Sequence, residues 1–322
     1  MERFLRSVCV AVALGILGSE GPALGQEPVK VKMARLAFPS LSSMMLDIVK
    51  ARGIDKKHGV EIETVNISAI PVYYASLASG EADMLAGGPL VAQKMILEGV
   101  PIRIGLTWAR MNILSVITAD PSIKSVADLK GKSIAADIGS SEYQILSVYG
   151  RSQGLIFGKD ITVVQASPPL ARTQLQAKRV DAAMIWEPTT TLALRDNPAY
   201  RVIFAGDKAW STISKFAGWD LVLMMREDFL KRRPDALPRL VSLFQDAQQY
   251  YKANLDEADK ILVASLKLPP GVFKEAVASG RLAYDVRPAW GSERAALWDM
   301  FKIAVDSGYL SKLPNENVIY TP

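Results

Sequence analysis

Serine and glycine residues follow several short apolar runs of this chain, at points where helical patterns begin. Gly139, Ser140 and Ser141 follow the apolar run 132–137 and open a predicted helix at 140–153. Free backbone N–H groups and a partial positive charge at a helix N-terminus suit an oxyanion, and Gly139 lets the backbone approach a ligand closely. These residues therefore predict an anion contact, although serine is also an ordinary helix-capping residue.

Two other segments repeat this arrangement. Ser40, Leu41 and Ser42 follow the first apolar run, and their hydroxyls either face a ligand or only cap the next helix. Gly87 and Gly88 end another apolar run, where glycine leaves room for a ligand or supplies the dihedral angles of a tight turn. We expect both segments to line the same binding site.

Trp186 and Glu187 form a third kind of candidate contact, after a buried apolar run. The indole either stacks on a flat or apolar part of a ligand or covers the core. The carboxylate either accepts a bond from an amino group or sits at a positive helix start without touching a ligand. Because a carboxylate repels an anion, a ligand contacted by Glu187 is expected to carry an N–H group as well as an acid group. Such a ligand fits better than nitrate.

Short apolar runs alternate with helical patterns, which is typical of right-handed βαβ units in a mostly parallel sheet. Strands are expected at residues 29–37, 60–65, 82–86, 102–108, 114–118, 132–137, 161–165, 182–186, 201–204 and 219–225. Helices are expected at residues 42–54, 70–79, 90–97, 140–153, 171–177, 189–195, 234–253, 255–266, 271–279 and 292–307. Ligands of such sheets bind beyond the carboxyl ends of the strands, where the serine and glycine residues lie.

The strand pattern restarts in the middle of the chain, and 322 residues exceed what one core usually organises. We therefore expect an α/β fold of two lobes with a C-terminal helical segment. One lobe would comprise residues 26–111 plus 219–322, and the other 112–218. Two crossovers, near 109–113 and 216–219, would permit hinge closure around a ligand.

The crossovers contribute four more candidate binding residues. Trp108 and Arg110 lie at the first crossover, and Trp219 and Asp220 lie at the second. Arg110 can hold a carboxylate or sulfonate with its paired donors. It is equally suited to an ion pair with Asp220 or a neighbouring acid, so the sequence leaves both roles open.

The first 25 residues have the three parts of a secretory signal peptide. Arg3 and Arg6 form a positive start, residues 8–17 are apolar, and small residues stand at Ala23 and Gly25. The apolar run is shorter than the ~20 residues that span a bilayer. We therefore expect cleavage after Gly25 and export to the periplasm.

The residue types argue against an enzyme. Cys9, the only cysteine, falls within the signal peptide, so the exported chain would have no thiol nucleophile, disulfide or thiolate metal site. His58, the only histidine, sits in a polar turn, which disfavours a serine–histidine–aspartate triad. No nucleotide-binding or zinc-protease motif is present, while a carboxylate dyad stays open. We predict no catalytic residue, no metal and no cofactor.

The overall composition fits a globular protein without a nucleic-acid partner. Apolar residues make up 49% of the chain and charged residues 22%, which is ordinary for a packed domain. The formal net charge of +5 comes from scattered lysines and arginines rather than one basic face.

Three stretches of the chain, taken in order and spacing, resemble a known family. They are Gly80–Asp83 with Gly87–Pro89, then Ser125–Lys132, then Asp181–Ala183 leading to Trp186–Pro188. They are similar to the nitrate/sulfonate/taurine-type periplasmic binding proteins of ABC importers, and the likeness covers residues 29–310. The Asp-Leu-Lys-Gly-Lys motif within the second stretch is shared by many bilobal binding proteins, so it specifies the superfamily better than the family.

The resemblance implies a bilobal periplasmic-binding-protein fold with a cleft between two α/β lobes, and a ligand contact at Gly139–Ser141. It implies a monomer that delivers a small-molecule solute to permease subunits in the inner membrane. The expected solute is a small organic anion or zwitterion, such as a sulfonate, a taurine-like compound or a carboxylate. Relatives also bind nitrate or pyrimidine precursors of thiamine, so a heteroaromatic solute stays open. Biosynthetic enzymes of the same fold are usually cytosolic, which the signal peptide disfavours.

Overall fold

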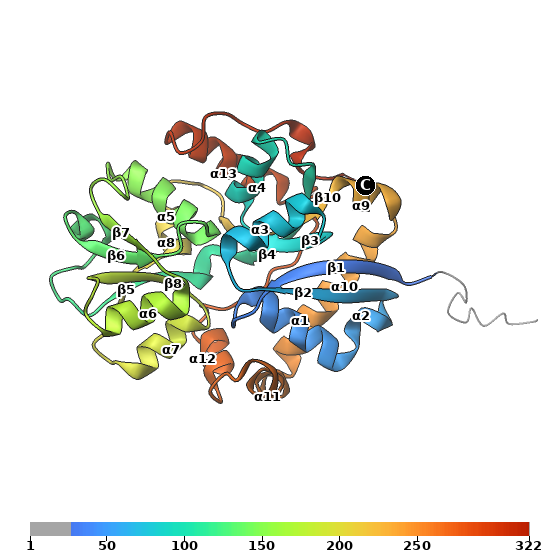
Figure 1. Ribbon diagram of the computed structural model, residues 1–322, viewed down its shortest axis with the longest axis horizontal. Coiled ribbons are helices and arrows are strands. Elements are labelled where there is room, and N and C mark those ends of the chain that lie inside the picture. The colour runs from blue at the N-terminus through green and yellow to red at the C-terminus, as the bar shows by residue number, and fades with distance from the viewer. Residues whose placement is uncertain (1–26, 322) are drawn as a thin grey trace, which may run out of the picture.

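The computed structural model describes residues 27–321 and folds them around two five-stranded sheets that lie side by side (Figure 1). The predicted signal peptide, residues 1–25, lies outside the described residues. Each sheet has helices on both faces, so each builds its own α/β lobe (Figure 1). The predicted α/β class and bilobal arrangement are confirmed.

The first lobe contains the strands at the start of the chain and one strand that returns much later. Its sheet has the order β2-β1-β3-β10-β4. The five strands are β1 (Val29–Leu36), β2 (Val60–Ile67), β3 (Met84–Gly87), β4 (Ile102–Arg110) and β10 (Trp219–Arg226). β3 is buried at every position, as expected of a strand covered by helices on both faces.

The second lobe is built from the middle of the chain. Its sheet has the order β7-β6-β8-β5-β9. The five strands are β5 (Leu114–Thr118), β6 (Ser133–Ala136), β7 (Thr162–Gln165), β8 (Ala182–Trp186) and β9 (Arg201–Ala205). A capping box formed by Ser125 and Asp128 opens the short turn η2 (Val126–Leu129).

The expectation of mostly parallel sheets is only half right. In each sheet two of the four strand pairings are parallel and two are antiparallel. The antiparallel pairings all involve β10 or β5, which are the first strands after a crossover between the sheets. A parallel pairing needs a crossover connection within one lobe, usually a helix, whereas β5 and β10 enter their sheets from the other lobe. The alternation of strands and helices along the sequence does not show where the chain changes lobe.

Helices cover both sheets, and five of them follow the last strand (Figure 1). The first lobe carries α1 (Leu41–Arg52), α2 (Ile54–Lys57), α3 (Ile70–Ser79) and α4 (Pro89–Leu97). The second lobe carries α5 (Ser141–Ser152), α6 (Pro168–Gln176), α7 (Thr189–Asp196) and α8 (Gly206–Trp210). The C-terminal segment contains α9 (Glu227–Arg232), α10 (Ala236–Ala253), α11 (Leu255–Leu266), α12 (Val272–Ala278), α13 (Arg294–Asp306) and the turn η3 (Glu316–Val318).

The helix predicted at 42–54 is two helices rather than one. Gly53 adopts the left-handed conformation, with a φ of 63°, and ends α1 there. Glycine is the residue that adopts this conformation without strain, so the break is local in origin. α2 then starts at Ile54.

Two short segments join the sheets. The chain leaves β4 through the 3₁₀ turn η1 (Met111–Ile113) and enters β5 directly. It returns through residues 211–218 to β10. A third link is α12, which belongs to the C-terminal segment but packs against α7 of the second lobe. The exact lobe bounds stay a prediction.

Within residues 27–321, no helix is both long enough and apolar enough to cross a bilayer.

Candidate functional site

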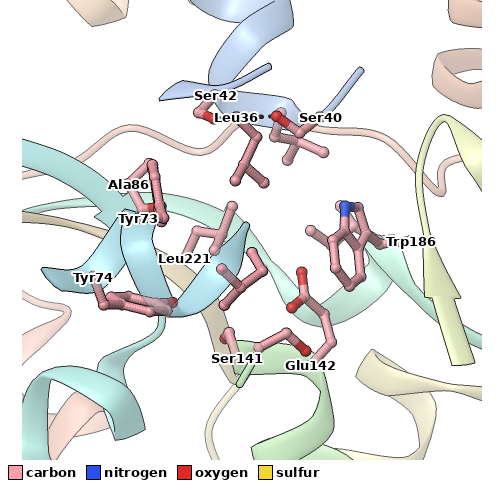
Figure 2. A pocket seen from close by; sticks show the side chains of 14 residues that line it. Leu36, Ser40, Ser42, Tyr73, Tyr74, Ala86, Ser141, Glu142, Trp186 and Leu221 are labelled. Carbon is pink, nitrogen blue, oxygen red and sulfur yellow. Dashed lines mark hydrogen bonds between the residues drawn. The ribbon is translucent and has the colours of Figure 1, made fainter. Parts of the chain in front are cut away.

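A small, largely enclosed cavity lies at the seam between the lobes, and both lobes line it (Figure 2). Its volume is about 30 Å³, which holds little more than a water molecule or two. A solute the size of an amino acid is larger than this cavity. The lining residues are Leu36, Ser40, Leu41, Ser42, Ile70, Tyr73, Tyr74, Ala86, Ile113, Ser140, Ser141, Glu142, Trp186 and Leu221.

The N-terminus of α1 forms one wall of the cavity. Ser40 has extended backbone, caps the helix and forms a capping box with Ser43. The Ser42 hydroxyl lies 3.1 Å from the Ser40 hydroxyl, and both residues line the cavity. Since the first turn of α1 contains no acidic residue, its partial positive charge is not compensated locally. This wall suits an oxyanion.

The N-terminus of α5 forms the opposite wall. Ser140 caps α5, and its side-chain oxygen accepts a 3.1 Å bond from the Tyr143 N–H. Ser140 and Ser141 line the cavity, whereas Gly139 does not. The Gly139 N–H instead donates to Asp137 at 3.2 Å. The predicted Gly139–Ser141 contact therefore reaches the cavity through its two serines.

Gly87 and Gly88 do not line the cavity but allow its walls to approach. A Cβ on Gly88 would lie 2.4 Å from the hydroxyl oxygen and 2.6 Å from the Cβ of Ser141, in the other lobe. A Cβ on Gly87 would lie 2.7 Å from the ring of Tyr74. Both distances are shorter than real Cβ contacts, and the absence of a side chain at Gly88 is what lets Ser141 of the other lobe approach.

Two tyrosines of α3 complete the polar surface. The Tyr73 hydroxyl donates to the Ala86 carbonyl oxygen at 2.9 Å, and the Gly88 N–H donates to the Tyr74 hydroxyl oxygen at 3.2 Å. Burial raises the pKa of both tyrosines well above the ordinary value, so both hydroxyls are neutral. Since the Tyr74 oxygen accepts its bond, its proton is free to donate elsewhere.

Glu142 brings a carboxyl group into the cavity, and sequence reasoning missed it. The residue is 5% exposed, and its carboxyl points into the cavity beside Trp186 (Figure 2). Burial, and after it the charge of Asp220, raise the pKa of Glu142 well above its usual range. The Ser140 hydroxyl lowers this pKa in part.

Asp220, at the start of β10, lies against Glu142 from the first lobe. It is fully buried, and the Ser141 hydroxyl lies 2.7 Å from its carbonyl oxygen and 2.9 Å from its Oδ1. Burial raises the pKa of Asp220 to about 7, while hydrogen bonds with Ser141 and Glu142 lower it in part. The two carboxyls therefore lie close together at the lobe seam, and the charge of Asp220 adds to the burial that disfavours a negative charge on Glu142.

Trp186 lines the cavity, whereas Glu187 points away from it. The Glu187 side chain is fully buried and accepts a 2.7 Å bond from Arg281 Nε and a 3.0 Å bond from the Thr191 hydroxyl. Burial raises the pKa of Glu187, and Arg281 partly opposes that shift. The Glu187 carboxylate is therefore bound by Arg281 of the C-terminal segment, and the acid that faces the cavity is Glu142.

The other crossover residues lie outside the cavity. Trp108 is buried in the first lobe, with its ring 4.6 Å from that of Phe244. The Arg110 guanidinium stacks 3.3 Å from the centre of the Trp219 ring. Arg110 also forms ion pairs with Asp285 at 3.0 Å and Glu293 at 3.1 Å, rather than with Asp220.

Arg110 lines a second, larger groove of about 740 Å³ beside the crossovers. This groove lies between the returning segment 211–218 and the C-terminal segment near residues 280–287. The binding roles of all the site residues expected from the sequence stay predictions, both for those that line the cavity and for those that lie outside it. No group of three or more His, Cys, Asp or Glu side chains within residues 27–321 is arranged to hold a metal.

Two mixed α/β lobes with a polar cavity at their seam define the class of periplasmic solute-binding proteins that serve ABC importers. A family model described as NMT1/THI5 like matches residues 50–258, and the chain belongs to this family. The resemblance drawn from the sequence motifs is confirmed.

Named relatives agree with this class. A Bacillus subtilis protein assigned as an aliphatic sulfonates-binding protein is 28% identical over 78% of this chain and 75% of its own length. The taurine-binding periplasmic protein of Escherichia coli is 24% identical over 70% of this chain and 66% of its own. These relatives are binding proteins rather than enzymes.

A solved structure shows the same fold. The alkanesulfonate-binding protein SsuA from Xanthomonas axonopodis pv. citri, bound to MOPS, superposes with a TM-score of 0.76. The match covers 92% of this chain and 99% of that chain at 20% identity. At this identity the likeness concerns the fold.

Proposed function

We propose that this protein is the periplasmic component of an ABC importer and captures a small zwitterion that carries an ammonium group and an acid group. The lobes would close over the solute, and permease subunits would recognise the closed monomer. Taurine is one member of this solute class, and the names of a taurine-binding relative and of a sulfonate-binding relative support it.

The observation that carries the proposal is the presence of two kinds of polar group around one cavity. The N-termini of α1 and α5 supply hydroxyls and N–H groups for an oxyanion, through Ser42 and Ser140. The Glu142 carboxyl supplies an acceptor for an ammonium group. None of the residues that line the cavity carries a positive charge, so a plain anion would meet a carboxyl without a balancing cation.

The argument made for Glu187 from the sequence therefore applies to Glu142. A solute with both N–H and acid groups satisfies both the serine hydroxyls and the Glu142 carboxyl, whereas nitrate satisfies only the serine hydroxyls. Water leaves the seam as the lobes close, which strengthens each of these contacts.

A thermal-shift and calorimetric panel tests the proposal, using taurine, 1-propanesulfonate and nitrate with the exported chain. The first two solutes have similar size, and a methyl group in 1-propanesulfonate replaces the ammonium group. Taurine is expected to bind most tightly and to raise the melting temperature, since ligand at 100 times Kd stabilises a protein by about 2.7 kcal/mol. Nitrate binding as tightly as taurine would contradict the proposed solute class.

A heteroaromatic amine is the second candidate, and Trp186 is the observation that favours it. The indole lines the cavity beside Glu142, so a flat ring could stack on Trp186 while its amino group meets the carboxyl (Figure 2). A response to aminopyrimidines without a response to taurine would select this candidate.

Export is tested separately by N-terminal sequencing of the protein from the periplasmic fraction. The expected first residue is Gln26, after removal of residues 1–25. An intact N-terminus in the cytoplasm would contradict the proposed location.

A further inference from the structure

Glu142 and Asp220 bring two carboxyl groups together from opposite lobes. Glu142 is in the first turn of α5, and Asp220 is the second residue of β10. Glu142 is 5% exposed and Asp220 is 0% exposed, so water does not screen the pair. Closing the lobes therefore places both acids in a low-dielectric seam.

The carboxyl oxygens of Asp220 have fewer N–H and O–H donors around them than they could accept bonds from. Asp220 Oδ2 is buried, and no N–H or O–H donor within residues 27–321 bonds to it. The Ser141 hydroxyl contacts both the carbonyl oxygen and Oδ1 of Asp220 but has only one proton to donate. Two ionised carboxylates cannot hydrogen-bond to each other, so the contact between Glu142 and Asp220 requires an acid proton.

The surroundings supply no cation in place of that proton. The titratable neighbours of the pair are Asp137, before α5, and Tyr73 and Tyr74 of α3. Asp137 disfavours a negative charge on Glu142, and the two tyrosines are neutral. β3 and β8 have no titratable side chain. The remaining charged groups on the packed elements are exposed to solvent, lie at the far end of their element or are engaged elsewhere, namely Lys94 of α4, Arg151 of α5, Asp207 and Lys208 of α8, Arg103 with Glu227, Arg226 and Arg232 with Asp228, Lys231 with Glu227, and Arg110 with Asp285 and Glu293.

We propose that Glu142 and Asp220 are the specificity-determining acids of the site: they share one proton when the lobes close without a cation, and a solute ammonium group replaces that proton. This inference rests on the proposed function, because it concerns the solute captured at the same seam. The step is a simple exchange. The ammonium group enters, the shared proton leaves to solvent, and both carboxylates then face a cation.

The exchange makes proton counts depend on the solute. A sulfonate without an ammonium group leaves the shared proton in place or draws one from solvent as the lobes close. Taurine brings its own positive charge to the same position. Taurine therefore binds with about one proton fewer taken up than 1-propanesulfonate, whatever the protonation state of the open form.

Isothermal titration calorimetry in buffers of different ionisation enthalpy measures this count. Taurine and 1-propanesulfonate are each titrated into wild type near pH 7 in two buffers. The expected result is a difference of about one proton between the solutes. Equal proton counts for the two solutes in wild type would overturn the inference.

Variants of Glu142 and Asp220 test whether these two acids cause the difference in proton count. Glu142→Gln and Asp220→Asn each replace one acid by an amide of the same shape, whose N–H₂ group can donate to the remaining carboxylate. Each variant should abolish the difference in proton count and weaken taurine binding more than 10-fold relative to 1-propanesulfonate. Asp55→Asn is the matched control, because Asp55 is a buried aspartate that pairs with Lys50 outside the cavity. It should leave the difference unchanged.

A solute-free measurement separates this inference from the proposed function. Infrared spectroscopy of the unliganded protein near neutral pH should show the carbonyl stretch of a protonated carboxylic acid. The band should be absent in Glu142→Gln and Asp220→Asn and present in Asp55→Asn. If neither sulfonate binds but the band behaves this way, the taurine-like solute is wrong and the acid pair stands. If the band is missing from wild type both without solute and in the complex with 1-propanesulfonate, where the lobes are closed without a cation, the acid pair is wrong, even where taurine binds.

Discussion

The Ser141 hydroxyl donates to the backbone carbonyl oxygen of Asp220 at 2.7 Å, and this bond joins the two lobes beside the cavity. Ser141 belongs to α5 of the second lobe and Asp220 to β10 of the first. Gly88 allows this approach, because it leaves no side chain between the two walls. The seam is therefore held by contacts between backbone and short side chains.

Gly88→Ala is expected to hinder lobe closure. The added Cβ would lie 2.4–2.6 Å from the Ser141 side chain and 3.1 Å from its Cα, so the backbone must shift. Overpacking of this kind costs about 1–3 kcal/mol, which corresponds to a loss of solute affinity of roughly 5- to 150-fold. Calorimetric titration of the solute checks this. Gly291→Ala is the control, since its Cβ meets only an ordinary contact at 3.6 Å. Equal affinities for the two variants would contradict the expected clash.

Arg281→Ala is expected to destabilise the protein. It leaves the fully buried Glu187 carboxylate without its cation, which costs roughly 3 kcal/mol or more. Urea unfolding followed by circular dichroism measures the loss. The double variant Glu187→Gln with Arg281→Met removes both charges and should recover much of the stability. A double variant as unstable as Arg281→Ala would argue against an effect of the unpaired charge.

Stability should depend on pH through Asp220. Its pKa is raised to about 7 in the folded protein, against about 4 for an ordinary aspartate. The folded state therefore binds more protons than the unfolded state between these values, and stability falls as pH rises through this window. Asp220→Asn should remove this decrease in the free energy of unfolding, which amounts to at most about 1.4 kcal/mol for each pH unit. Denaturant unfolding of both proteins from pH 4 to pH 8 checks the difference in slope. Parallel pH profiles would show that Asp220 is ionised in the folded state.

Trp186 should report the arrival of a solute. Its indole lines the cavity and is 3% exposed, so a bound solute changes its surroundings directly. Solute binding is expected to change tryptophan fluorescence in wild type. Trp186→Phe should lose most of this change while the other five tryptophans remain. An undiminished change in the variant would place the solute away from the seam.

Strand positions were largely predictable, because each strand is a short apolar run with clear ends. The bounds of β5 and β8 are those expected from the sequence. The short helices α2, α8 and α9 were not predicted, since four to six residues are too few to show a helical period.

The serines that line the cavity were predictable, because capping residues have a recognisable place before a helix. Glu142 was missed, since an acidic residue in the first turn of a helix ordinarily only offsets the helix dipole. Glu187 looked like the acid of the site because its partner is distant in sequence. Arg281 lies 94 residues further along the chain, and only the folded structure brings the two together.

A crystal structure of the protein grown with taurine tests most directly whether the seam cavity captures a zwitterion. The account predicts taurine between the lobes, with its sulfonate at Ser42 and Ser140 and its nitrogen about 3 Å from the Glu142 carboxyl. Taurine bound only in the groove beside Arg110, or lying at the seam with its ammonium group turned away from Glu142, would contradict it.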